Sequence, residues 1–238
     1  MEAKTYVLVH GAFHGGWCWK DVATRLRALG HTVYTPTQTG LGERSHLLRT
    51  RPTLETFVQD VEQVFRYEEL DDVILVGHSF GGVTVTALAD RIPERLRHLV
   101  YLDASLAQHG ESTLDLIPAD RQEAYHQRAI DTAEGFFVEP PDPAYLGISD
   151  PEIAAWIRPK LTPQPFQPFL DRLQLRNPQG NGVPATFIDC TNPPSPSIAT
   201  SRERARSRPG WTYLEIPTGH NAMTLMPGEL TQMLAALG

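Results

Sequence analysis

The sequence predicts an α/β protein with a mainly parallel sheet of about six strands and helices on both faces. Short runs rich in Val, Ile and Leu alternate with longer segments whose apolar residues recur at helical spacing. This alternation is typical of parallel strands joined by right-handed helical crossovers. One stretch in the middle of the chain, residues 109–182, interrupts the pattern and carries half of the 20 prolines, which indicates an inserted helical cap.

The first part of the chain alternates regularly. Residues 73–76 form the clearest strand, because four consecutive apolar residues indicate burial on both faces. Gly30 is placed to end the first helix, and residues 37–52 read as a loop. The expected strands are residues 5–10, 32–35, 73–76 and 98–103, and the expected helices are about residues 17–29, 54–65 and 83–92.

The alternation returns after the interruption. Short amphipathic pieces inside it are expected around residues 122–133, 151–157 and 166–175. Later strands are expected at residues 184–190 and 211–216, with helices near 198–206 and after Pro227. We therefore expect residues 1–108 and 183–238 to form one core. Residues 109–182 would cover the carboxyl edge of the sheet, where open α/β sheets bind ligands.

The totals fit a globular protein and disfavour several other classes. The chain has 238 residues, of which 41% are hydrophobic, and a formal net charge of −7. This charge disfavours nucleic acid and anionic membranes as partners. The first strand begins directly after residues 1–4, which leaves no room for a signal peptide. Cys18 and Cys190 lack a metal-type spacing. We expect a reduced, cytoplasmic protein, and a homodimer is compatible with these totals.

The best-defined motif is Gly77-His-Ser-Phe-Gly81, between the strand 73–76 and the helix that begins near Val83. A G-x-S-x-G pattern in this context is a nucleophile elbow. Side chains at 77 or 81 would clash with the flanking strand and helix, so glycine is required. The helix N-terminus points free N–H groups at an oxyanion formed beside Ser79. We therefore expect Ser79 to be a nucleophile.

A second and more specific stretch is His10-Gly-Ala-Phe-His-Gly-Gly-Trp17. The two motifs resemble those of the α/β-hydrolase superfamily, and more narrowly the plant methylesterase and hydroxynitrile lyase group. Small bacterial esterases related to that group, some acting on xenobiotic esters and carbamates, are the most similar. The resemblance covers most of the chain, and more loosely residues 109–182. It implies an α/β-hydrolase fold, no organic cofactor and a small hydrophobic ester as substrate.

A hydrolytic serine needs a base, because its hydroxyl is barely ionised at neutral pH. His220 follows the last expected strand and occupies the base position of the family. His78 reads as a structural residue of the elbow. His10 and His14 have a spacing that could suit metal ligands, but a glycine turn separates them and no third ligand is evident, so we expect no metal site.

The acid of the triad leaves two candidates. The family usually places it where this chain has Pro193, which cannot orient an imidazole. Asp103 ends the strand beside the nucleophile's strand, and neighbouring strands lie about 4.8 Å apart, so Asp103 and Ser79 would emerge side by side. Some superfamily members, including haloalkane dehalogenases, carry the acid there. Asp189 lies within its strand, where its direction depends on register. We favour Asp103.

The resemblance also assigns groups around the reacting carbonyl. The N–H of Phe80 and a second N–H at Ala12, with Phe13 close by, would form the oxyanion hole. Their apolar surroundings favour hydrophobic esters over charged ones. The candidates for the wall of the substrate pocket are Trp156, Leu106 and Met223.

Hydrolysis of a carboxylic or carbamate ester is the first of three functional hypotheses. A hydroxynitrile lyase is the second, but that branch needs a threonine and a lysine where this chain has Gly11 and Asn221. The third is a non-catalytic ligand receptor, which a complete set of Ser79, His220 and Asp103 disfavours. Dehalogenase or epoxide hydrolase chemistry would need a carboxylate at position 79.

Overall fold

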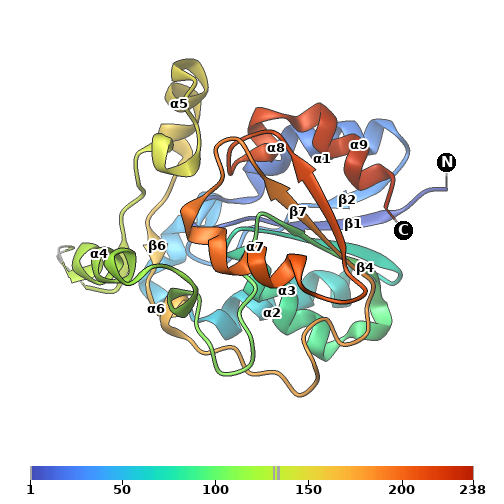
Figure 1. The fold of residues 1–238 in the computed structure, drawn as a ribbon, viewed down its shortest axis with the longest axis horizontal. Coiled ribbons are helices and arrows are strands. Elements are labelled where there is room, and N and C mark those ends of the chain that lie inside the picture. The colour runs from blue at the N-terminus through green and yellow to red at the C-terminus, as the bar shows by residue number, and fades with distance from the viewer. Residues whose placement is uncertain (1, 131, 133–134, 238) are drawn as a thin grey trace.

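The computed structural model describes residues 2–130, 132 and 135–237. Its main sheet has six parallel strands in the order β2–β1–β3–β4–β7–β8 (Figure 1). The strands are β1 (Thr5–Val9), β2 (Thr32–Tyr34), β3 (Val73–His78), β4 (Leu96–Leu102), β7 (Ala185–Cys190) and β8 (Thr212–Ile216). The expected parallel α/β architecture is therefore confirmed.

Helices cover both faces of this sheet. One face carries α2 (Leu54–Tyr67), α3 (Gly81–Arg91) and α7 (Ala199–Arg206). The other carries α1 (Lys20–Ala28), α8 (Ala222–Leu225) and α9 (Pro227–Ala235). Successive side chains of a strand point to opposite faces. Val7 and Val9 of β1 therefore join the first apolar cluster, whereas Tyr6 and Leu8 join the second.

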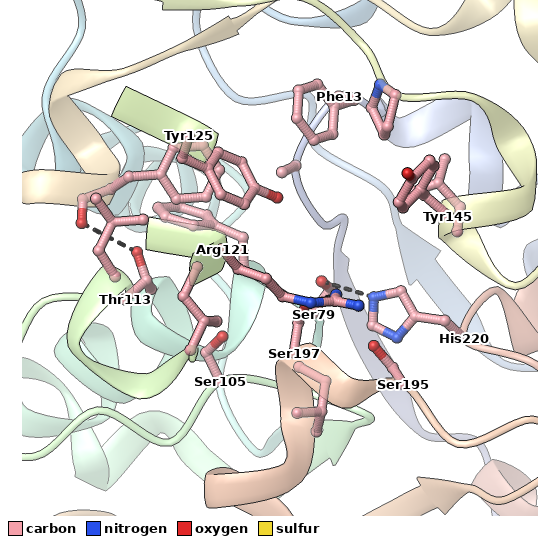
Figure 2. Close-up of a pocket in the computed structure, with 18 of the residues that line it drawn as sticks. Phe13, Ser79, Ser105, Thr113, Arg121, Tyr125, Tyr145, Ser195, Ser197 and His220 are labelled. Atoms are coloured by element: carbon pink, nitrogen blue, oxygen red, sulfur yellow. Dashed lines mark hydrogen bonds between the residues drawn. The ribbon is translucent and has the colours of Figure 1, made fainter. Parts of the chain in front are cut away.

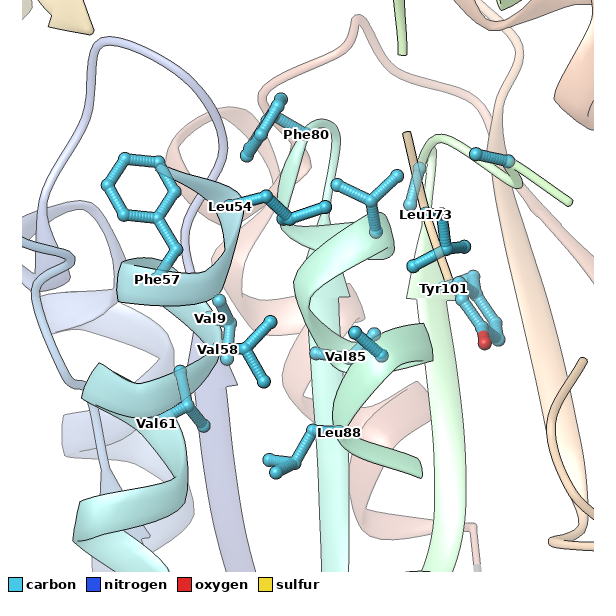
Figure 3. Close-up of a cluster of buried hydrophobic side chains, with 14 of the residues drawn as sticks. Val9, Leu54, Phe57, Val58, Val61, Phe80, Val85, Leu88, Tyr101 and Leu173 are labelled. Carbon is cyan, nitrogen blue, oxygen red and sulfur yellow. The ribbon is translucent and has the colours of Figure 1, made fainter. Parts of the chain in front are cut away.

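The cluster between α2, α3 and the sheet fixes the helix that follows Ser79 (Figure 3). Phe57, Val58 and Val61 lie on one face of α2, as the amphipathic pattern predicts, and are buried with Val85 and Leu88 of α3. Burying a side chain of this kind contributes about 1.5–3 kcal/mol. Both helices are thus held firmly against the strand that carries the elbow.

Residues 109–182 lie between β4 and β7 in the sequence. They contain α4 (Ala119–Ile130), α5 (Pro151–Ile157), α6 (Gln167–Leu170) and a two-stranded antiparallel sheet of β5 (Phe137–Val138) and β6 (Gln164–Pro165). The labelled α4, α5, α6 and β6 lie on the left of Figure 1, away from most of the main sheet. The last helix is shorter than the expected piece 166–175. The Asp171 carboxylate that follows it accepts a hydrogen bond from the N–H of Leu54, at the start of α2.

Three further features bear on the expectations from the sequence. The segment expected as a loop, residues 37–52, contains a 3-10 helix at Gly42–Thr50. Cys18 and Cys190 are buried free thiols. In the part of the chain that the structure describes, no helix has the length and apolar character needed to cross a bilayer.

Candidate active site

Ser79 lies in the tight turn between β3 and α3. Its backbone has φ 52°, in the left-handed region that residues other than glycine rarely adopt. A Cβ at Gly77 would lie 2.7 Å from Val85 Cγ2, and a Cβ at Gly81 would lie 2.8 Å from the His10 carbonyl oxygen. Both glycines are therefore required for the close approach of β1, β3 and α3. The turn presents the Ser79 hydroxyl to a cavity.

Two hydrogen bonds join Ser79 to a histidine and a buried carboxylate. Ser79 Oγ–H donates to His220 Nε2 at 2.8 Å (Figure 2), and His220 Nδ1–H donates to Asp103 Oδ2 at 2.6 Å. Register explains the meeting, because His78 pairs with Leu102 and the two residues that follow leave neighbouring strands together. The structure thus brings together the three residues expected to form the triad.

Asp189, the alternative acid, has other partners. Its carboxylate accepts hydrogen bonds from Arg202 Nε at 2.5 Å and from the Tyr213 hydroxyl at 2.7 Å. Arg202 also reaches Asp103 Oδ1, at 3.5 Å. One guanidinium therefore lies between two buried carboxylates, and only Asp103 among them bonds to His220 in the described structure.

The structure brings the three residues expected at the oxyanion hole, Ala12, Phe13 and Phe80, to the wall of the cavity. The Phe13 N–H, however, donates to Gln164 Oε1 at 3.1 Å, so it is not free for an oxyanion. No such bond is found for the N–H groups of Ala12 and Phe80 within the described residues. The pair that remains available is Ala12 and Phe80, and Phe13 is corrected to a wall residue.

A cavity of about 400 Å³ lies beside Ser79 and His220 (Figure 2). Aromatic and aliphatic side chains from the loop after β1, the elbow and the segment 109–182 form much of its wall. They are Phe13, Phe80, Leu114, Ile117, Tyr125 and Phe169. This arrangement gives a reacting carbonyl a mostly apolar surrounding.

The three expected pocket residues lie outside this cavity lining, and that expectation is wrong. Trp156 is 43% exposed on α5 and packs edge-on against Trp17. Leu106 is buried in the cluster with α2 and α3, whereas Met223 is buried on the opposite face of the sheet. Proximity in sequence to Asp103 and His220 did not place Leu106 or Met223 beside the substrate, because their side chains point into the two cores.

Polar residues that the sequence did not reveal line the same cavity. Arg121 of α4 donates from Nη1 to Ser197 Oγ at 3.0 Å, and both residues contact the cavity together with Ser195. In an isolated sequence, Arg121 is one of several polar residues in an amphipathic helix. Its position beside Ser79 depends on how α4 packs, for which the sequence carries no local signal.

The histidines near the first strand are neutral and structural. His10 Nδ1–H donates to the Gly11 carbonyl, and His10 Nε2 accepts from the Gln38 N–H. Burial lowers the pKa of His10 to about 3 and that of His14 to about 4. His78 Nε2–H donates to the His220 carbonyl, and this hydrogen bond holds the loop that carries His220. Across residues 2–130, 132 and 135–237, no group of three or more acidic, His or Cys side chains could hold a metal ion.

Gly11 and Asn221 occupy the two positions where a hydroxynitrile lyase would need threonine and lysine. A Cβ at Gly11 would lie 2.8 Å from Ser79 Cβ, so threonine does not fit there without a shift. Asn221 is buried and donates from Nδ2 to the Leu146 carbonyl at 2.8 Å. It therefore carries a structural hydrogen bond rather than a positive charge for a departing cyanide.

Known proteins resemble this chain along nearly its whole length. The model of the alpha/beta hydrolase family matches residues 6–232. A carbendazim hydrolyzing esterase from Nocardioides sp. (strain SG-4G) is 40% identical over 242 residues, covering 98% of this chain and 99% of that protein. Methylesterase 1 of Arabidopsis thaliana is 35% identical over 111 residues, which cover 45% of this chain and 42% of the plant protein.

A solved structure agrees with the arrangement of strands and helices. An extracellular alpha/beta-hydrolase from a Paenibacillus species superposes with a TM-score of 0.87 and 24% identity, and the match covers 99% of both chains. At this identity the likeness shows the shared fold. With the family match over residues 6–232 and the full-length relative, the chain belongs to the alpha/beta hydrolase family.

Proposed function

We propose that this chain is a serine hydrolase that cleaves apolar carboxylic esters or carbamate esters through an acyl-enzyme intermediate. The observation that carries the proposal is the pair of hydrogen bonds from Ser79 to His220 and from His220 to Asp103, at the wall of one cavity. Residues 109–182 act as the cap of that cavity. The carbendazim hydrolyzing esterase supports the ester and carbamate class, since carbendazim is a methyl carbamate.

The geometry supports a two-step reaction. Ser79 Oγ attacks the carbonyl carbon while His220 Nε2 takes the hydroxyl proton, and the N–H groups of Ala12 and Phe80 stabilise the oxyanion. The carbon–oxygen bond to the leaving alcohol then breaks, and His220 gives its proton to that oxygen. Water, deprotonated by His220, then attacks the acyl carbon. The bond from that carbon to Ser79 Oγ breaks, His220 returns the proton to Ser79 Oγ, and the acid is released. Asp103 holds His220 in the productive tautomer throughout.

The test uses p-nitrophenyl butyrate and an active-site phosphonate on the purified protein. We expect the wild type to turn over the ester and to be labelled by the phosphonate at Ser79. Ser79→Ala should lose at least a thousandfold in kcat, because the nucleophile is absent. Ser112→Ala, which removes a buried hydroxyl away from the cavity lining, is the matched control and should keep activity. Undiminished turnover by Ser79→Ala would refute the assignment of the nucleophile.

A further inference from the structure

The catalytic cavity contains a cation whose charge the described part of the chain does not balance, and we infer that Arg121 binds an anionic group, such as a carboxylate, on the ester substrate. This inference rests on the proposed function and changes its substrate class from uncharged apolar esters to apolar esters that carry one anionic group. The preferred ester would have an apolar body and one negative charge. The sequence alone favoured uncharged esters, so the structure changes that expectation.

The position of Arg121 is the first support. Its side chain extends from α4 toward Ser79 and His220 (Figure 2), and all three residues line the same cavity. Ser195 and Ser197 lie on the same side, whereas Phe13 and Tyr125 lie on the other (Figure 2). The cavity therefore has a polar side centred on a guanidinium and an aromatic side, which suits a molecule with one charged end and an apolar body.

The lack of an acidic partner is the second support. Several arginines of this chain pair with carboxylates, such as Arg44 with Asp60 at 2.9 Å and Arg158 with Asp142 at 2.9 Å, whereas Arg128 bonds to a backbone carbonyl. In residues 2–130, 132 and 135–237 the structure shows no such partner for Arg121. Its one side-chain hydrogen bond goes to the neutral Ser197 hydroxyl. A guanidinium has five donors in a planar fork that matches a carboxylate, and Ser197 uses one of them in the described part of the chain.

Charges around the cavity leave room for an anion. Asp120, Arg121 and Arg128 are the charged side chains among its lining residues, so the wall carries one excess positive charge. Arg128 donates to the Glu139 carbonyl, whereas Arg121 extends toward Ser79 and His220. Asp103 is fully buried behind His220 and has Arg202 beside its second oxygen, 3.5 Å away. The cavity wall thus has a net positive charge in a chain whose formal net charge is −7. Because the chain is acidic as a whole, a generally basic surface does not explain the arginine at this cavity.

Two other roles for Arg121 make different predictions. If it only anchored α4 to the loop that carries Ser197, every substrate would lose equally when that contact is removed. If it stabilised the oxyanion of the reaction, every ester would lose kcat. A site for an anionic group predicts a loss confined to the charged ester and expressed mainly in KM.

The experiment compares two pairs of esters on wild type and Arg121→Gln. The first pair, mono-p-nitrophenyl adipate and p-nitrophenyl hexanoate, places a carboxylate on the acyl side. The second, 4-carboxyphenyl hexanoate and phenyl hexanoate, places it on the leaving group. We expect Arg121→Gln to lower kcat/KM about 10- to 100-fold for the charged member of one pair, the size expected when a hydrogen bond between ionic groups is removed. The neutral members should change less than threefold.

Three control variants make the test specific. Arg128→Gln removes another cavity arginine, whose guanidinium bonds to the Glu139 carbonyl, and should leave the charged-to-neutral ratio within threefold. Ser197→Ala removes the contact with α4 and should also preserve the ratio. Arg121→Lys keeps the charge without the planar fork and should retain part of the preference, which tests the site even where Arg121→Gln folds poorly.

The possible failures are distinguishable. A ratio unchanged by Arg121→Gln in both pairs, an equal loss on neutral and charged esters, or an equal effect of Arg128→Gln overturns the anion site. If one of these outcomes occurs but the wild type cleaves the neutral esters and reacts with the phosphonate, the anion site is refuted and the proposed hydrolase function is retained. If the wild type cleaves none of the four esters and Ser79 is not labelled, both proposals fail.

Discussion

At the scale of single residues, the site depends on two residues whose backbone has a positive φ, Ser79 and Asp103. Ser79 has φ 52° and Asp103 has φ 40°, and each follows the last residue of its strand. Such conformations are strained for residues other than glycine and persist where the surroundings fix them. The strands are adjacent and in register, so both side chains turn toward the same imidazole. This geometry supports the proposal that Asp103 is the acid, while the position usual in the family holds Pro193.

The acid assignment is tested by replacing each buried aspartate with asparagine. We expect Asp103→Asn to lower kcat by about 10³- to 10⁴-fold on p-nitrophenyl butyrate, as loss of the acid does in a comparable triad. Asp189→Asn should change kcat less than tenfold, because Asp189 bonds to Arg202 and Tyr213 instead of His220. Steady-state kinetics on both variants decides the point. A larger loss for Asp189→Asn would move the acid to that residue.

At the scale of elements, α7 contacts the site through Arg202. The guanidinium of Arg202 bonds to Asp103, which follows β4, and to Asp189 within β7. Its side chain is only 12% exposed. Breaking a buried ionic group by removing one partner leaves an uncompensated charge, which is strongly destabilising. The helix is therefore tied to the catalytic edge by charge as well as by apolar packing.

We expect Arg202→Met to lower the free energy of unfolding by about 3 kcal/mol at pH 7. The physical reason is that two buried carboxylates lose their shared cation. Urea unfolding measured by circular dichroism checks this value. The double variant with Asp189→Asn removes one of the carboxylates and should be more stable than the single variant. If the double variant is instead less stable by the sum of the two single effects, Arg202 and Asp189 are not coupled.

At the scale of the whole molecule, the strand edge that carries the site also buries neutral histidines. Burial lowers the pKa of His10 to about 3, that of His14 to about 4, and that of His78 well below its ordinary value. In the unfolded chain these groups bind protons below about pH 6.5. Stability is therefore complete above that pH and declines as the pH falls toward the folded pKa values.

For His10 alone, this linkage lowers the free energy of unfolding by about 2 kcal/mol between pH 7.5 and pH 5. We expect His10→Asn to be less stable at neutral pH, because two hydrogen bonds change, yet to lose about 2 kcal/mol less over this interval. Urea unfolding at the two pH values measures the difference. His46→Asn, which replaces an exposed histidine, should keep the wild-type interval. An unchanged interval in His10→Asn would contradict the linkage.

The sequence by itself determined the order of strands and helices, the elbow and its nucleophile candidate, since these depend on local periodicity and on glycines that a tight turn requires. It also placed Asp103 beside Ser79, because adjacent parallel strands end at the same edge. It could not place Trp156, Leu106 and Met223 correctly, nor reveal the bond from Phe13 to Gln164.

The tertiary structure alone decided what surrounds the reacting atoms. The packing of residues 109–182 pairs the Phe13 N–H with Gln164 and brings Arg121 to the cavity, although α4 lies far along the chain from Ser79. Register within β7 turned Asp189 toward Arg202. The physical reason is common to these cases. Local sequence determines which segments form strands, helices and tight turns. The partners of a side chain on another element depend on tertiary packing, which no local pattern encodes.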